Sequence, residues 1–113
     1  MCSSDLPLGP VVVTRDEIPD PQALRIRTFV NDEPRQDSGT DDMAFTVARV
    51  VTFASEAITL RPGDVIATGT PSGVGVFADP PVFLKAGDVV RIEITGIGVL
   101  ENRVEPGKPA CMK

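Results

Sequence analysis

The chain has 113 residues, a formal net charge of −5 at pH 7 and no histidine. A chain of this length fits a single domain, and an acidic chain without any run of Lys or Arg is a poor partner for nucleic acid. The longest apolar stretch carries Arg49 and Glu56, which makes it a poor membrane span. The lack of histidine also removes the Ser-His and Cys-His nucleophile pairs and the commonest zinc ligand. We therefore expect no nucleic acid and no membrane among the partners.

The two cysteines, Cys2 and Cys111, stand near the two ends of the chain and form no Cys-x-x-Cys motif. Two cysteines in a chain of this length do not indicate a disulfide-stabilised scaffold. They suit a reducing compartment, so we predict a cytoplasmic location.

Eleven prolines and ten glycines divide the chain into short segments, which favours strands and turns over a helical bundle. The first candidate strand is the "VVV" of residues 11–13. Residues 24–30, "LRIRTFV", alternate apolar and polar side chains and predict a half-buried strand. Asn31 and Asp32 then predict a turn into a returning arm at residues 33–36, which Pro34 places at the edge of a sheet.

The one convincing helix covers residues 38–57, "SGTDDMAFTVARVVTFASEA". Thr40, Asp41 and Asp42 offer oxygen atoms that suit an N-terminal cap. An apolar stripe follows at helical spacing, formed by Met43, Val47, Val50, Val51, Ala54 and Ile58. We expect this helix to lie on a sheet with its other face in water.

A seven-residue pattern occurs twice after this helix, as "LRPGDVI" at residues 60–66 and "LKAGDVV" at residues 84–90. We interpret both copies as the same tight turn, in which the side chains of Asp64 and Asp88 bond to nearby backbone. Each turn is expected to lead into a strand, at residues 64–69 and 88–96. A last strand is predicted at residues 98–104, with Glu101 and Arg103 facing solvent.

The most informative stretch is "GDVIATGTPSGVG", which ends the first of these predicted strands in a glycine-rich loop. A phosphate-binding P-loop needs a lysine that this stretch lacks. A dinucleotide-binding loop and a nucleophile elbow each need a following helix, which Asp79-Pro80-Pro81 forbids. Two interpretations remain: an ordinary turn, or a loop that presents the hydroxyls of Thr68, Thr70 and Ser72 to something small and anionic.

The flanking motifs favour the second interpretation, because their order along the chain is more specific than any one of them. "LRPGDVIATGTPSGVG", then "LKAGDVVRIEITGIGVLENRV", with "IPDPQALRIRTFVNDEPRQDSGTDDM" upstream, resemble the C-terminal part of the fumarylacetoacetate hydrolase family. The resemblance covers Pro7 to Gly107. It implies a mainly β (α+β) fold, a truncated mixed β-roll or distorted barrel with one principal helix.

The resemblance also implies a chemistry for this chain. The family acts on 2-oxo acids and β-diketo acids by hydrolytic C–C cleavage, decarboxylation or keto-enol isomerisation, using Mg²⁺ or Mn²⁺ held by a Glu-x-Glu pair and a later Asp. This sequence contains no Glu-x-Glu, and it lacks the lysine expected before Pro7-Leu8-Gly9-Pro10. We therefore assign no metal ligand and no catalytic residue to this chain. Of the family's site, the Thr-Gly-Thr-Pro loop carries over, with Thr70 and Gly69 as substrate-binding residues.

Several other polar residues have two interpretations. Asp37, Asp41 and Asp42 form either a metal cluster or, as we favour, caps before the helix. Gln36 matches a family position near the helix entry, where it supports the substrate surroundings or bonds backbone.

Together these features predict a domain organisation and a function. We expect residues 1–6 to be a non-native leader, because Cys-Ser-Ser-Asp-Leu reads as the translated end of a common sequencing adapter. Residues 7–113 are expected to be the C-terminal portion of a catalytic domain that is inactive alone and homodimeric when complete. The alternative is a short non-catalytic β-roll that serves as a binding or dimerisation module.

Overall fold

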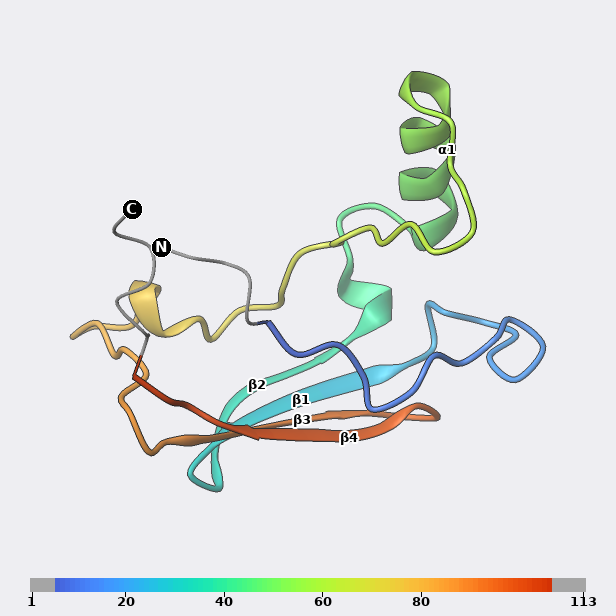
Figure 1. Cartoon of the computed structure of the whole chain (residues 1–113). Helices are drawn as coiled ribbons and strands as arrows, with labels where there is room; N and C mark the ends of the chain where they lie inside the picture. The colour runs from blue at the N-terminus through green and yellow to red at the C-terminus, as the bar shows by residue number, and fades with distance from the viewer. Residues whose placement is uncertain (1–5, 107–113) are drawn as a thin grey trace, which may run out of the picture.

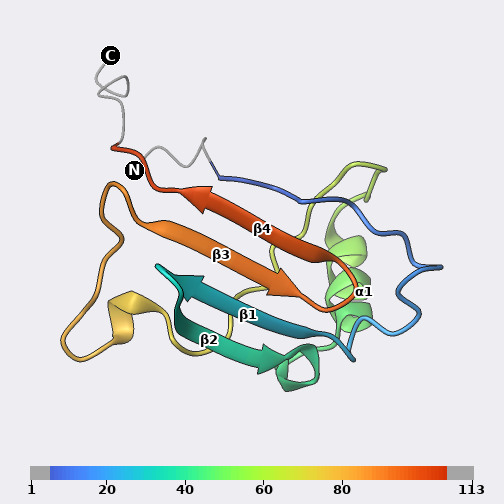
Figure 2. The same ribbon diagram turned by 90° about the horizontal axis from the view of Figure 1, so that it is seen from below.

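The computed structural model describes residues 6–106 and consists of one sheet, one helix and long connecting segments. Its regular elements, in chain order, are β1 (Arg25–Val30), β2 (Glu33–Gly39), the 3-10 turn η1 (Thr40–Asp42), α1 (Val47–Ala57), the 3-10 turn η2 (Gly75–Phe77), β3 (Val89–Ile94) and β4 (Gly98–Arg103). The strands form a single antiparallel sheet in the order β2-β1-β3-β4 (Figures 1 and 2). One sheet with one principal helix confirms the predicted fold class.

The hairpin of β1 and β2 forms as the sequence predicted, with one irregularity. Asn31 and Asp32 have φ values of 52° and 64°, which a two-residue hairpin turn requires and which these residue types tolerate. β2 is an edge strand, as Pro34 indicated, but it extends three residues beyond the predicted arm. Thr28 pairs with Gln36 while Phe29 pairs with Pro34, so that one residue of β2 is left over as a β-bulge.

The repeated turn is confirmed at both positions. The Oδ2 atoms of Asp64 and Asp88 each accept a backbone N–H from three residues upstream, at 2.8 Å. Gly63 and Gly87 have φ values of 96° and 95°, so the two turns share one backbone conformation. The Lys85 backbone N–H and then the Asn31 side chain lower the pKa of Asp88 from its ordinary value, since both donate to its carboxylate.

Only one of the two repeated turns leads into a strand. The predicted strand at residues 88–96 is β3, and the final predicted strand is β4, on which Glu101 and Arg103 are exposed. Residues 11–13 and 64–69 are loop segments and form no strand, which corrects both predictions. Neither segment pairs with a strand of the described sheet, and the side chains of Val11, Val12, Val65 and Ile66 are exposed.

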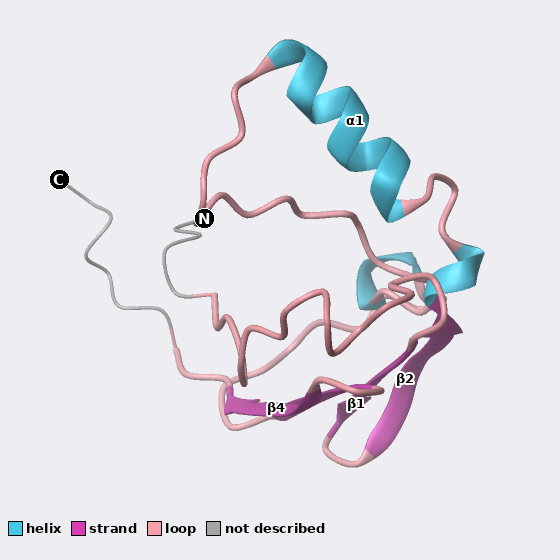
Figure 3. Cartoon of the chain, turned by 90° about the vertical axis from the view of Figure 1, so that its right-hand side faces the viewer, coloured by secondary structure: helices cyan, strands magenta, loops and turns pink. Residues whose placement is uncertain are grey.

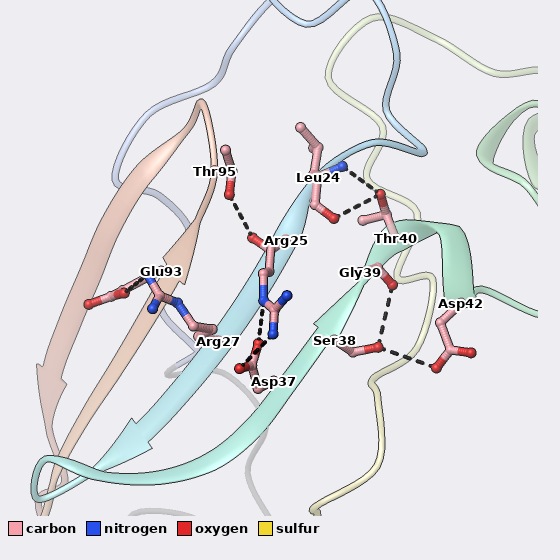
Figure 4. Close-up of polar contacts among 10 residues, drawn as sticks. All are labelled: Leu24, Arg25, Arg27, Asp37, Ser38, Gly39, Thr40, Asp42, Glu93 and Thr95. Carbon is pink, nitrogen blue, oxygen red and sulfur yellow. Dashed lines mark hydrogen bonds and ion pairs between the residues drawn. The ribbon is translucent and has the colours of Figure 1, made fainter.

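The helix begins later than predicted. The Thr46 hydroxyl accepts the Arg49 N–H at 3.3 Å and caps α1, whose first N–H, that of Val47, is accepted by Gln22 Oε1 at 2.7 Å. The Thr40 hydroxyl is engaged elsewhere, because it accepts the Leu24 N–H at 3.0 Å and ties η1 to the segment before β1 (Figure 4). The prediction that Thr40, Asp41 and Asp42 cap the helix is therefore wrong.

The helix also does not lie on the sheet. It stands away from the strands, connected by loops (Figures 1 and 3), and within residues 6–106 it makes no extensive contact with any strand. Val47, Val50 and Ala54 of the predicted stripe are half-buried, whereas Val51 and Ile58 are exposed. The apolar stripe is therefore only partly covered, and it does not form a packed interface with the sheet.

The described residues enclose no fully buried side chain. The Cα radius of gyration is 16.0 Å, against about 13 Å for a compact domain of this length. Large apolar side chains remain in contact with water just before and on α1, on the segment after α1, and on and after η2. They include Phe45, Phe53, Val65, Phe77, Phe83 and Leu84. None of the described helices is long and apolar enough to cross a bilayer.

Candidate functional site

A pocket of about 430 Å³ lies beside the glycine-rich loop, a volume within the usual range for small-molecule sites. Its lining combines the loop with the first half of β1, the end of β2, η1 and the start of α1. The lining residues are Ile26, Ser38, Gly39, Thr40, Asp42, Met43, Ala44, Phe45, Val50, Thr68, Gly69, Thr70, Pro71 and Ser72. The predicted substrate-binding residues Gly69 and Thr70 thus line one pocket. Thr68 and Ser72, whose hydroxyls the sequence analysis also singled out, line the same pocket.

Two glycines give the loop its path. Gly69 has a φ of 99°, and an added Cβ would meet no atom within 4 Å, so the backbone conformation alone requires glycine there. Gly73 has a φ of 100°, and an added Cβ would collide with the carbonyl oxygen of Arg35. The loop therefore lies directly against β2 at this point.

Gln36 holds the loop from the β2 side. Its Nε2 donates to Thr70 Oγ1 at 2.8 Å and to the Pro71 carbonyl oxygen at 2.8 Å. Gln36 is half-buried, whereas Thr70 is exposed. The sequence left open whether Gln36 bonds the substrate surroundings or backbone. In the structure it does both, because it bonds the Pro71 carbonyl and the Thr70 hydroxyl that is predicted to meet the substrate.

Other lining residues were not expected at a site, because the sequence analysis placed Met43 and Val50 in the apolar stripe of the helix and assigned Phe45 no role. Met43, Phe45 and Val50 supply an apolar wall, and Ser38 Oγ donates to Asp42 Oδ2 at 3.2 Å (Figure 4). The segment before α1 reads as the first turn of a helix, so its contribution to a pocket was not apparent. Gln22 was missed as well, although it links η1 and α1 by donating to the Thr40 carbonyl and accepting from Val47.

The charges near the pocket do not suit an anion. Asp42 is the one ionisable residue in the described lining. The nearby Asp37 is engaged by Arg25, whose Nε and Nη2 donate to its carboxylate at 2.7 and 2.9 Å (Figure 4). These hydrogen bonds lower the pKa of Asp37 from its ordinary value, although both partners are exposed and such pairs contribute little to stability. The described lining therefore offers an anionic ligand neutral hydrogen-bond donors, without a cation among the lining residues.

A divalent metal ion is not held by the described residues alone. Between residues 6 and 106, no three Asp, Glu, Cys or His side chains come close enough together to ligate one. Asp37, Asp41 and Asp42 therefore form no metal cluster, just as they form no cap on α1. The carboxylates within residues 6–106 therefore do not by themselves provide the ligand set that the family resemblance implied.

Comparison with known proteins identifies the family to which this chain belongs. The family model for the C-terminal region of fumarylacetoacetate hydrolase matches residues 2–105, so the chain belongs to the fumarylacetoacetate hydrolase family. Among curated relatives, the mitochondrial oxaloacetate tautomerase fahd2 of Xenopus laevis is 55% identical over 98 residues.

Solved structures give the same result. The fumarylacetoacetate hydrolase of Exiguobacterium antarcticum is 48% identical with a TM-score of 0.85, over 89% of this chain and 36% of that chain. The maleylpyruvate hydrolase of Sphingobium sp. SYK-6, in complex with manganese(II) and pyruvate, is 40% identical with a TM-score of 0.79, over 90% of this chain and 36% of that chain. The Xenopus match covers 87% of this chain and 31% of the relative, so this chain spans about a third of that relative's length. The expected leader at residues 1–6 stays a prediction, and its first five residues lie outside the described part.

Proposed function

We propose that residues 7–113 are the C-terminal portion of a divalent-metal-dependent enzyme that acts on 2-oxo or β-diketo acids. The enzyme would catalyse C–C bond hydrolysis, decarboxylation or keto-enol isomerisation. The observation that supports this most directly is the loop of residues 68–72, whose Thr70 hydroxyl is held by Gln36 at the wall of a small-molecule-sized pocket. The relatives named above are an oxaloacetate tautomerase, a fumarylacetoacetate hydrolase and a maleylpyruvate hydrolase, all of which act on acids of this class.

In this proposal the chain binds and orients the substrate. A carboxylate at the loop would accept a hydrogen bond from the Thr70 hydroxyl, and Gly69 would let the backbone come close to it. The apolar wall of Met43, Phe45 and Val50 would exclude water from the remainder of the acid. Hydrogen bonds to a charged oxygen are about twice as strong as neutral ones, which compensates in part for the missing cation.

The metal would be Mg²⁺ or Mn²⁺, with its ligands outside this chain. The manganese in the maleylpyruvate hydrolase complex supports divalent-metal use in the family. We assign no catalytic step to the described residues, because none of them brings a metal or a paired acid and base to the pocket.

Three further predictions accompany the proposal. The partner is a small oxo or diketo acid, and the complete enzyme is a homodimer. The cytoplasmic location inferred from the cysteines stays a prediction, and the Xenopus relative is described as mitochondrial.

The test is the activity of the full-length protein that carries this chain. It would be purified, stripped of metal by chelation and assayed with oxaloacetate, maleylpyruvate and fumarylacetoacetate, with and without added Mg²⁺ or Mn²⁺. We expect turnover of at least one of these acids, and we expect chelation to abolish it. Full-length protein that turns over none of them under any metal condition would contradict the proposal and favour the non-catalytic β-roll.

A further inference from the structure

Three features of β2 converge on Gln36. The β-bulge makes Arg35 the extra residue immediately before it, and bulges change the direction in which neighbouring side chains point. Gly73 of the loop lies against the carbonyl oxygen of the same Arg35. Gln36 then reaches the loop with two hydrogen bonds of 2.8 Å. The loop segment Thr70–Gly73 is therefore held against β2 at both of its ends, by Gln36 at Thr70 and by the close approach to Arg35 at Gly73.

The direction of the two hydrogen bonds follows from the chemistry of the partners. The Pro71 carbonyl oxygen is only an acceptor, so the Gln36 atom that faces it must be the amide nitrogen. The same nitrogen donates to Thr70 Oγ1. The Thr70 oxygen consequently acts as an acceptor toward Gln36, and the hydroxyl proton must point elsewhere.

The open side of the Thr70 hydroxyl is the pocket. Among residues 6–106, Thr70 donates its hydroxyl proton to no acceptor. Thr70 is part of the pocket lining, whereas Gln36 lies outside it. A bound ligand is thus the natural acceptor for this proton, and Gln36 acts on the ligand only through Thr70.

We propose that Gln36 is a positioning residue that orients the Thr70 hydroxyl as a donor toward the pocket. The site thereby favours a ligand oxygen that accepts this proton, such as an ionised carboxylate. This inference rests on the proposed function, because it assigns the selected oxygen to the carboxylate of the oxo acid.

Gln36→Glu tests this role, because it preserves the shape of the side chain and reverses the direction of the hydrogen bond between residue 36 and Thr70. The introduced carboxylate accepts the Thr70 proton, which removes the donor from the pocket, and it faces the Pro71 carbonyl without a proton between them. We expect kcat/KM of the full-length protein at pH 7.5 to fall about ten- to hundred-fold, mainly through KM. Gln36→Met cannot accept that proton, so the expected loss is smaller, about two- to tenfold.

The pH profile gives a second readout. The introduced carboxyl group can donate to the Pro71 carbonyl only when protonated, which raises its pKa above the ordinary Glu value of about 4.3. The kcat/KM of Gln36→Glu, expressed relative to the unsubstituted protein at the same pH, should recover between pH 7.5 and pH 5. A structural role, in which Gln36 only holds the Pro71 carbonyl, predicts the same recovery. The two roles are separated in the Thr70→Val background: Gln36→Glu should cause no further loss there if Gln36 acts through Thr70, and an equal further loss if its role is structural.

The inference is wrong if Gln36→Glu keeps full kcat/KM at pH 7.5, or if its loss is the same at every pH. Should circular dichroism show that Gln36→Glu is unfolded, Gln36→Met decides: a KM increase with kcat preserved supports the inference, and unchanged kinetics overturn it. If the unsubstituted protein turns over no oxo acid, the proposed function fails separately. Calorimetric titration with pyruvate then tests the inference, which requires weaker binding by Gln36→Glu at pH 7.5 that is restored at pH 5.

Discussion

Replacing Thr70 by Val removes the hydroxyl that the account places against the substrate and keeps the shape of the side chain. Thr70 is exposed at the pocket, and Gln36 also donates to the Pro71 carbonyl, a bond that the variant should retain. The loop should therefore stay in place. A hydrogen bond to a charged group contributes about 1.5–3 kcal/mol, which corresponds to an approximately ten- to hundred-fold loss of kcat/KM at about 1.36 kcal/mol per factor of ten.

The assay is steady-state turnover of the preferred oxo acid by the full-length protein, with Ser72→Ala as the matched control. Ser72 lines the same pocket and also loses a hydroxyl, but the family resemblance gives it no substrate contact. The control should remain within about twofold of the unsubstituted protein, since exposed substitutions away from specific interactions change free energies by about 0.5 kcal/mol or less. Both variants should show the same thermal midpoint.

The reasoning would be refuted by Thr70→Val that keeps full activity on every accepted acid. The hydroxyl would then have no part in binding, and only the backbone N–H groups of the loop would remain as this chain's contribution. Equal losses in Thr70→Val and Ser72→Ala would refute it too, because a general disturbance of the loop would explain both.

Three further predictions concern stability, pH and the isolated chain. Gly73→Ala should lower the unfolding free energy by about 1–3 kcal/mol in urea titrations, because the residue has a positive φ and its Cβ would collide with Arg35; Gly63→Ala, strained but in open space, should cost less, and equal losses would exclude the collision. The pKa of Asp88 is lowered in the folded state, so its ionised carboxylate adds to the free energy of unfolding above its unfolded pKa, and this stabilisation is lost as the pH falls through its folded pKa. The urea midpoint should therefore fall less steeply below pH 5 in Asp88→Asn than in the unsubstituted protein. The 113-residue chain alone should turn over no oxo acid with Mg²⁺ or Mn²⁺ and should bind the dye ANS, because its described residues form no metal site and leave apolar side chains exposed; turnover by that chain would contradict the assignment of the ligands to another part of the enzyme.

The features predicted correctly from the sequence are those fixed by neighbours along the chain. The turns at Asp64 and Asp88 and the hairpin turn at Asn31 depend on side chains and backbone within a few residues, so their residue types are sufficient to identify them. The loop around Thr70 was identified only when its own motif was combined with the flanking motifs, and its role in substrate binding stays a prediction.

The features predicted incorrectly depend on contacts between distant parts of the chain. The start of α1 was misplaced because the Thr40 hydroxyl bonds Leu24, 16 residues away, and Gln22 takes the N–H of Val47 from 25 residues away. Residues 64–69 have the composition of a strand, but a strand also needs a neighbour to pair with, and the described sheet provides none. The link from Gln36 to Thr70 spans 34 residues, and its direction depends on a β-bulge that no local pattern revealed.

The central claim is that the Thr70 hydroxyl, held by Gln36, receives the carboxylate of an oxo acid. A crystal structure of the full-length protein with bound pyruvate and Mn²⁺ tests it most directly. The account predicts a carboxylate oxygen about 2.5–3.0 Å from Thr70 Oγ1, with the Gln36 amide still bonded to both Thr70 and Pro71. Pyruvate bound with its carboxylate away from the loop, or a Gln36 amide that no longer bonds Thr70, would contradict the account.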